Sequence, residues 1–132
     1  MSVFYLDTSV VMRALLGHSP TAARWLFDAS SDNSSTLFSS RILRTEMTRV
    51  LRREGLPVST RDEVLDYIYL MPMSESVLAA AEVIGPVVKT LDAIHLGSVV
   101  VSGLDAIVVT HDAGMAAAAK ELGYVVFDPV TD

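Results

Sequence analysis

Short apolar runs alternate along the chain with longer stretches in which apolar residues recur at helical spacing. Runs rich in Val, Ile, Tyr and Phe are typical of buried strands, whereas recurrence every three to four residues is typical of helices. The pattern predicts strands at 2–7, 36–39, 106–110 and 124–127, and residues 69–73 fit either a strand or a loop. Helices are predicted between these runs, one ending at Gly17 and others at about 19–29, 41–53, 60–67, 75–84, 91–102 and 112–122.

Helix signals of known chemistry mark several of these boundaries. Ser19 precedes Pro20, an N-cap residue followed by the imino acid that favours the first turn of a helix. Thr60 stands three residues before Glu63, which is the spacing of a capping box and predicts a helix from there through Tyr67. Strands separated by helices predict an α/β fold, with a central, mostly parallel sheet of four to five strands flanked by helices on both faces.

Length and composition narrow the class of protein. The 132 residues fit a single domain spanning 1–132, and 51% hydrophobic content excludes a disordered chain. There is no cysteine, which excludes disulfide scaffolds, thiol catalysis and Cys-based metal sites. The longest uncharged apolar stretch, 93–104, is too short to cross a membrane, and the N-terminus lacks the basic region of a signal peptide. We therefore expect a soluble cytoplasmic protein without membrane partners.

The net charge of −6 is distributed unevenly. Residues 41–61 hold six arginines against two glutamates and carry +4, so the remaining chain carries −10. Arginine suits phosphate recognition, which makes this segment a candidate nucleic-acid contact. A solvated helix face with local pairs, such as Glu54 beside its arginines, explains the same pattern. The candidate contacts within the segment are Arg44, Arg49, Arg52 and Arg53.

Four acids occupy positions where a parallel sheet binds ligands. Such sheets bind at the carboxyl ends of their strands. Asp7 ends the first predicted strand, Asp112 follows the strand that ends at Thr110, and Glu46 and Asp92 lie on helices expected to pack above that edge. Converging carboxylates raise one another's pKa values unless a cation neutralises them, and Mg²⁺ prefers such oxygen ligands.

Each acid also has a structural interpretation. Asp7 and Asp112 fit helix N-caps, Asp92 fits first-turn dipole chemistry, and Glu46 has arginines nearby with which to pair. The tetrapeptide Leu-Asp-Ala-Ile occurs twice, and Asp105 in the second copy precedes a strand, which predicts a turn far from the site.

Polar residues beside the acids are candidates for supporting roles. Ser9 and Thr110 are candidate hydroxyls that orient an acid or a metal-bound water. His95 and His111 fit plain core or surface histidines, or groups that support the site or touch RNA, better than Mg²⁺ ligands, since Mg²⁺ favours oxygen.

The order and spacing of these segments resemble a known family. The segments are Tyr-Leu-Asp-Thr-Ser at the start, Arg-Thr-Glu-Met-Thr-Arg-Val-Leu in the middle, Thr-Leu-Asp-Ala-Ile-His-Leu, and Val-Thr-His-Asp before an Ala-rich helix. Together they resemble the PIN-domain ribonucleases over essentially the whole chain, and more closely the toxins of VapBC toxin–antitoxin pairs. Gly97, where a small Ala is common, is a departure expected only to loosen its helix, and Gly114 is a similar weak point.

The resemblance implies a function and a site. It implies that Asp7, Glu46, Asp92 and Asp112 form a Mg²⁺ or Mn²⁺ site that hydrolyses RNA, with one or two ions held mainly by Asp7 and Asp92. It also implies a homodimer and a VapB-type antitoxin that occludes the site, often with a basic side chain. The arginine segment would then face either RNA or the antitoxin.

Two other classes remain as alternatives. Phosphotransfer domains of the haloacid dehalogenase type require an Asp at position 9, where Ser9 stands, and receiver domains require a Lys at the end of the last strand, where the chain has Phe127 and Asp128. The second alternative is a catalytically inactive PIN-like module that binds RNA or protein, and the four mutually repelling acids argue against it.

Overall fold

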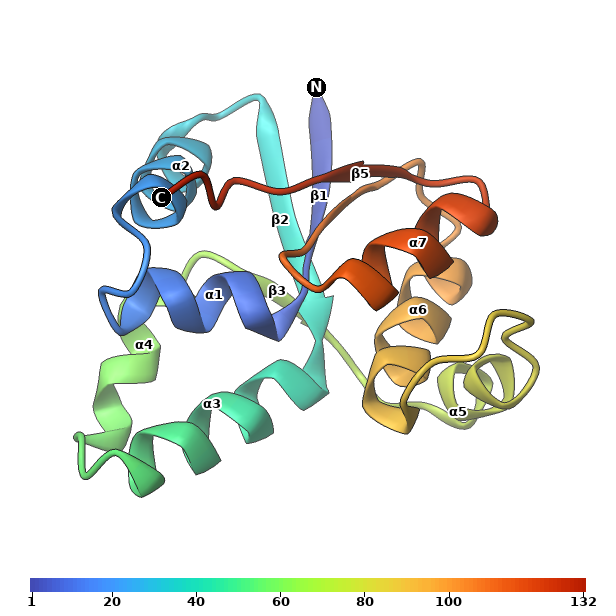
Figure 1. The fold of residues 1–132 in the computed structure, drawn as a ribbon, viewed down its shortest axis with the longest axis horizontal. Helices are drawn as coiled ribbons and strands as arrows, with labels where there is room; N and C mark the ends of the chain where they lie inside the picture. The colour runs from blue at the N-terminus through green and yellow to red at the C-terminus, as the bar shows by residue number, and fades with distance from the viewer.

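A five-stranded parallel sheet forms the centre of the computed structural model, which describes residues 1–132 (Figure 1). The strands are β1 (Ser2–Leu6), β2 (Ser35–Ser40), β3 (Tyr69–Met71), β4 (Ile107–Val109) and β5 (Val125–Phe127), in the order β3-β2-β1-β4-β5. Tyr5 of β1 pairs with Phe38 of β2 on one side and Val108 of β4 on the other. The predicted fold class is confirmed, and every strand pair is parallel.

Helices cover both faces of this sheet. They are α1 (Thr8–Leu15), α2 (Pro20–Ser31), α3 (Arg41–Arg53), the 3₁₀ turn η1 (Val58–Arg61), α4 (Asp62–Leu65), α5 (Glu75–Glu82), α6 (Thr90–Ser102) and α7 (Ala113–Glu121). In Figure 1, α1 to α4 lie on one side of β1 and β2, and α5 to α7 lie on the other. No helix is both long and apolar enough to span a bilayer.

The alternation of β1 side chains supplies both layers of the core. Leu6 is buried against helices α1 to α3, together with Val10 and Met47. Tyr5 points to the opposite face and is buried with Leu96 of α6 and Met115 of α7. Because a central parallel strand is covered on both faces, it reads as a nearly continuous apolar run, which is why the sequence pattern located it.

Side-chain caps fix where several helices begin. Ser19 accepts a hydrogen bond from the backbone N–H of Ala22, and Ser74 accepts one from Val77. Each cap satisfies an N–H group that has no partner within the helix. These local signals explain why the predicted starts of α2 and α5 agree with the structure to within about one residue.

The capping box predicted at Thr60 and Glu63 is wrong. Thr60 lies inside η1, where its N–H donates to the carbonyl of Pro57, so it is not at a helix N-cap. Helix α4 begins at Asp62 without a side-chain cap and ends at Leu65, so no helix runs through Tyr67. The ambiguous segment 69–73 contains β3, because Tyr69–Met71 pairs with Phe38–Ser40 of β2.

Gly97 serves a packing role that its sequence context did not indicate. A Cβ atom at Gly97 would lie 2.8 Å from the carbonyl oxygen of Val77 and 3.0 Å from the backbone nitrogen of Ala81. Both atoms belong to the backbone of α5, which cannot turn aside as a flexible side chain can. The expectation that Gly97 only loosens its helix is therefore wrong, because the missing side chain allows α5 to lie directly on α6.

Candidate active site

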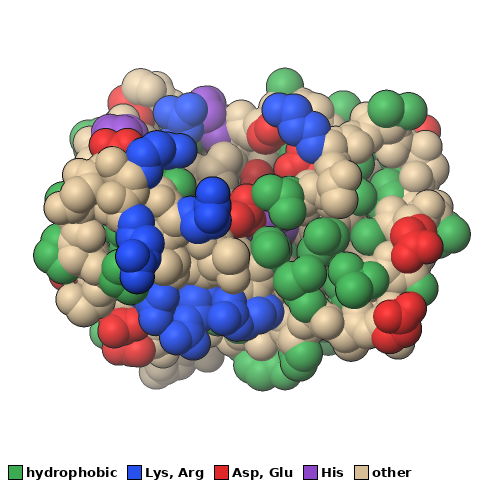
Figure 2. Space-filling view, turned by 90° about the horizontal axis from the view of Figure 1, so that it is seen from below, with side chains coloured by type: hydrophobic (Ala, Val, Ile, Leu, Met, Phe, Trp, Pro, Cys, Tyr) green, Lys and Arg blue, Asp and Glu red, His purple; other side chains and the backbone are tan.

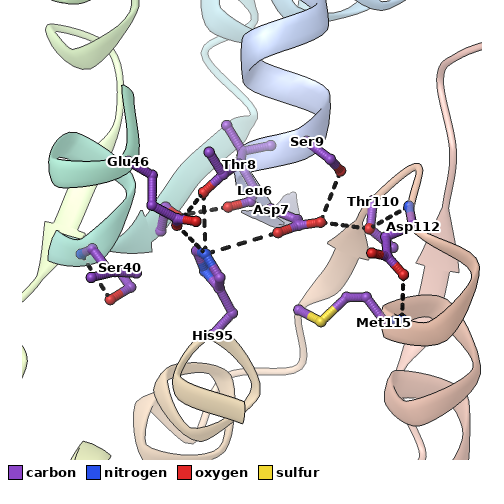
Figure 3. A network of polar contacts seen from close by, with 12 residues as sticks. Leu6, Asp7, Thr8, Ser9, Ser40, Glu46, His95, Thr110, Asp112 and Met115 are labelled. Atoms are coloured by element: carbon purple, nitrogen blue, oxygen red, sulfur yellow. Dashed lines mark hydrogen bonds and ion pairs between the residues drawn. The ribbon is translucent and has the colours of Figure 1, made fainter. Parts of the chain in front are cut away.

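The candidate site lies at the edge of the sheet where the parallel strands end. Asp7 follows β1 directly and lies beside Thr110, which follows β4. Glu46 reaches this edge from α3 and His95 reaches it from α6 (Figure 3). Asp7 is only 4% exposed, so its charge depends on the groups around it rather than on bulk water.

Two hydroxyl groups hold one oxygen of Asp7. Its Oδ2 accepts hydrogen bonds from Ser9 Oγ at 2.8 Å and from Thr110 Oγ1 at 2.7 Å (Figure 3). Although Asp7 occupies the N-cap position of α1, its side chain makes no capping hydrogen bond. The structure thus places the candidate hydroxyls Ser9 and Thr110 on Asp7. Its Oδ1 accepts no hydrogen bond within the chain and lies 3.8 Å from His95 Nε2 (Figure 3).

Thr110 also connects Asp7 to Asp112. The backbone N–H of Asp112 donates to Thr110 Oγ1 at 3.0 Å, while the hydroxyl of Thr110 donates to Asp7. Asp112 Oδ1 caps α7 by accepting from the N–H of Met115 at 3.0 Å, so the N-cap interpretation holds for one of its two oxygens. Its Oδ2 has no hydrogen-bond partner within the chain.

Glu46 bonds to the core of the site rather than to an arginine. Its Oε1 accepts from Thr8 Oγ1 at 2.7 Å and lies 3.0 Å from His95 Nε2. Burial alone would raise the pKa of Glu46, but the hydrogen bonds from His95 and Thr8 outweigh it and lower that pKa below its ordinary value of 4.5. The expectation that repulsion raises the pKa of every acid in the site is wrong for Glu46.

Asp92 behaves in the opposite way. Burial raises its pKa above the ordinary value of 3.8, and the carboxylates of Asp7 and Asp112 raise it further. His95 and Lys89 act in the other direction but do not cancel the rise. Asp92, in the first turn of α6, therefore lies within electrostatic reach of both acids that follow the strands.

Sequence reasoning missed a buried chain of polar groups behind these acids. His95 is 1% exposed, and its two ring nitrogens face different partners. Nδ1 lies 2.7 Å from the hydroxyl of Tyr5, while Nε2 lies near Glu46 and Thr8. The available signals were the position of Thr8 directly after Asp7 and of His95 three residues after Asp92, but neither shows that residues so far apart in sequence meet.

The other candidates lie outside this chain of contacts. His111 is half-buried, and its Nδ1 lies 2.9 Å from Asp128 Oδ2. Asp105 is exposed in the loop before β4, at the amino end of the sheet, as its sequence context predicted. The repeated tetrapeptide thus places Asp92 at the acidic edge and Asp105 away from it.

The donor set of this edge is suited to a hard divalent cation. Each of these acids keeps a carboxylate oxygen that accepts no hydrogen bond within the chain; the acids are Asp7, Glu46, Asp92 and Asp112. No three of these side chains yet lie close enough together to form a complete metal centre. The chemistry of the donors, which are all carboxylate oxygens, fits Mg²⁺ or Mn²⁺.

Arginines of α3 border the acidic edge on one side. Figure 2 looks at the face where β1 and β2 end, and most of its blue side chains lie on one half, beside a hollow that contains acidic side chains. Arg44, Arg49 and Arg52 are exposed and form no ion pair, while Arg53 Nε lies 3.6 Å from Glu54. Arg49 and Arg53 follow Glu46 by three and seven residues and so share its side of the helix, whereas Arg44 does not.

Comparison with known proteins identifies the family. The sequence model of the PIN domain matches residues 4–121. The chain therefore belongs to the PIN domain family. It is 33% identical, over 134 aligned residues, to Ribonuclease VapC47 of Mycobacterium tuberculosis (strain CDC 1551 / Oshkosh), and the alignment covers 96% of this chain and 97% of that protein.

Solved structures show the same fold at lower sequence identity. The crystal structure of VapBC2 from Rickettsia felis, bound to a DNA fragment from its promoter, has a TM-score of 0.73 at 14% identity and covers 96% of this chain and 98% of that one. A toxin–antitoxin complex from Klebsiella pneumoniae has a TM-score of 0.68 at 15% identity, covering 96% and 97%. FitAB bound to an IR36 DNA fragment has a TM-score of 0.61 at 20% identity, covering 96% and 94%.

Proposed function

We propose that this protein is a metal-dependent ribonuclease that acts as the toxin of a type II toxin–antitoxin pair. The observation that carries the proposal is the meeting of acids from separate elements at the carboxyl edge of the sheet. The carboxylates of Asp7 and Asp112 raise the pKa of Asp92, so the three groups share one electrostatic site. A group of partly buried carboxylates is costly without a cation, which gives a metal a physical role here.

Asp7 and Asp92 are the proposed principal metal ligands. Ser9 and Thr110 hold Oδ2 of Asp7, which leaves its Oδ1 available, and Asp92 accepts no hydrogen bond within the chain. Asp112 Oδ2 and Glu46 Oε2 are free to assist. When bound, Mg²⁺ or Mn²⁺ supplies charge neutralisation for the phosphodiester and lowers the pKa of a water molecule.

The chain's own residues orient the reacting groups. Thr110 fixes the spacing of Asp7 and Asp112 by bonding to both. The pKa of Glu46 is lowered, so the group is ionised at neutral pH and its free oxygen can accept a hydrogen bond from the attacking water. The burial of Asp7 strengthens its hydrogen bonds with Ser9 and Thr110.

The arginine segment is the proposed contact for the RNA backbone. Arg49 and Arg53 lie on the side of α3 that carries Glu46, so a strand held by them passes the acids. Single-stranded or looped RNA is the expected substrate, because its bases are exposed for recognition. The arginines would steer a polyanion towards a site whose own net charge is negative.

We further propose a VapB-type antitoxin as partner and a homodimer as the assembly. The relatives named VapBC2 and the Klebsiella pneumoniae toxin–antitoxin complex support such a partner. Phe27 and Tyr67, exposed by 70% and 61%, flank an apolar groove of about 300 Å³ between α2 and α4 and are candidate contacts for another chain.

Cleavage of RNA by the purified chain tests the enzymatic proposal. Total bacterial RNA incubated with the protein and Mg²⁺ should yield discrete fragments, and excess chelator should abolish them. Restoring Mg²⁺ or adding Mn²⁺ should recover cleavage. Equal cleavage in chelator would refute the metal mechanism, while RNA binding without any cleavage would favour the inactive binding module.

A further inference from the structure

We propose that His95 is a positioning residue that sets the orientation of the Glu46 carboxylate. Tyr5 and Thr8 determine which ring nitrogen of His95 carries the hydrogen. This inference rests on the proposed function, since it assumes that Glu46 takes part in the reaction. The contacts run from the core to the site in the order Tyr5 hydroxyl, His95 Nδ1, His95 Nε2 and Glu46 Oε1. Figure 3 shows the part of this chain between His95 and Glu46.

Counting hydrogen atoms fixes the direction of each bond. The hydroxyl of Thr8 donates its single hydrogen to Glu46 Oε1 at 2.7 Å, so its oxygen can only accept from His95. An ionised Glu46 can also only accept. His95 Nε2, at 3.0 Å from Glu46 and 3.2 Å from Thr8, must therefore carry a hydrogen and donate it towards both oxygens.

Tyr5 determines which nitrogen that hydrogen occupies. In a neutral imidazole only one nitrogen bears hydrogen, and the other accepts. The hydroxyl of Tyr5 is fully buried and lies 2.7 Å from Nδ1, where it donates its hydrogen to that nitrogen. A donor at Nδ1 selects the imidazole form with hydrogen on Nε2, which is the form that Glu46 needs.

The consequence falls on the free oxygen of Glu46. Thr8 and His95 both hold Oε1, so rotation of the carboxylate is blocked and Oε2, which has no partner within the chain, keeps one position at the edge of the site. A flexible glutamate on an exposed helix would lose this preorganisation. Residues that orient a catalytic or metal-binding group in this way typically contribute roughly 10- to 100-fold to activity.

Substitutions that keep a nitrogen at the position of only Nδ1 or only Nε2 distinguish a positioning role of His95 from a packing role. The amide nitrogen of glutamine reaches the position of Nε2, whereas that of asparagine reaches only Nδ1. We expect His95→Asn to lower kcat for RNA cleavage by roughly 10- to 100-fold with little change in KM, and His95→Gln to recover most of it. Tyr5→Phe, which keeps the ring but removes the donor, should lower kcat by a smaller factor.

Two controls make the outcomes distinct. Thermal unfolding of both His95 variants shows whether they fold equally well, and Glu46→Gln shows whether Glu46 matters. Equal losses in the two His95 variants, or full activity of a folded His95→Asn protein beside an inactive Glu46→Gln protein, would overturn the positioning role. Full activity of Glu46→Gln would instead overturn the part of the proposed function on which this inference rests.

A measurement without substrate tests the same claim. A long-range ¹H–¹⁵N NMR spectrum identifies which imidazole nitrogen carries hydrogen, and the chain contains only three histidines. The signal of His95, assigned by its absence in His95→Gln, should show hydrogen on Nε2 in the wild-type protein and a changed pattern in Tyr5→Phe. Hydrogen on Nδ1 alone would contradict the proposal.

Discussion

Replacing Gly97 by alanine tests whether helix α5 packs directly on the backbone of α6. The added Cβ would lie 2.8 Å from the carbonyl oxygen of Val77. Carbon–oxygen contacts between packed helices are normally about 3.3–3.6 Å, so α5 would have to retreat by about 0.5 Å or more. Because the contacted atoms are backbone, the whole helix must move.

Two opposing effects decide the change in stability. Alanine in the interior of a helix is favoured over glycine by about 1 kcal/mol. Overpacking against a rigid neighbour typically costs about 1–3 kcal/mol. We therefore expect Gly97→Ala to lower the free energy of unfolding by about 1 kcal/mol, which corresponds to a fall in Tm of roughly 4 °C for a chain of this length.

Calorimetry of two glycine variants measures this difference. Gly114→Ala in α7 is the matched control, because its Cβ would meet only the side-chain oxygen Asp112 Oδ1, at 3.3 Å. That variant should be as stable as the wild type or more stable. If Gly97→Ala also proved as stable as the wild type, the close approach of α5 would not limit this position, and the glycine would be only a weak point of its helix.

Three further predictions concern charge. Reversal of the charge at Arg49 (Arg49→Glu) should weaken RNA binding and reduce its salt dependence by about one phosphate contact. Arg44→Glu, on another side of α3, should weaken binding less. If both variants bound RNA as tightly as the wild type, the arginines would be only a solvated helix face. Asp92→Asn should raise the Tm of the metal-free protein at neutral pH, because the raised pKa of Asp92 means that its ionised form destabilises the fold. The difference in Tm between variant and wild type should disappear as pH falls through that pKa. A variant with a lower Tm than the wild type at neutral pH would contradict this prediction. Glu46→Gln should lower the Tm at neutral pH, because the lowered pKa of Glu46 means that its ionised form stabilises the fold. This stabilisation is present above the ordinary pKa of 4.5 and is lost as pH falls through the lowered pKa. A difference in Tm that persists in acid would point to lost packing instead.

Local signals in the sequence were sufficient for most of the fold. The buried run of β1 and the Ser19 cap of α2 depend on neighbours in sequence, so their positions could be predicted. The state of 69–73 could not, because β3 is a strand only through its pairing with β2. Thr60 and Glu63 have the spacing of a capping box, but Pro57 starts a 3₁₀ turn that takes up Thr60 first.

The sequence was sufficient to predict where the acids lie, but not which side chains they bond to. The positions of Asp7 and Asp112 follow from where parallel strands end. The contact of His95 with Tyr5 joins residues 90 positions apart, and nothing in either segment indicates the other. Glu46 has several arginines near it in sequence, two of them on its own side of α3, yet its carboxylate bonds to Thr8 and His95. Charge spacing alone therefore pointed to the wrong partner.

The rate of RNA cleavage by Asp92→Asn, set beside that of Asp105→Asn, tests the central claim most directly. Both aspartates occupy the same tetrapeptide, but only Asp92 lies within reach of Asp7 and Asp112. With Mg²⁺ present, Asp92→Asn should cleave RNA no faster than the wild-type protein in excess chelator, and Asp105→Asn should cleave at the wild-type rate. Cleavage by Asp92→Asn at the wild-type rate would contradict a catalytic metal site at the carboxyl edge of the sheet.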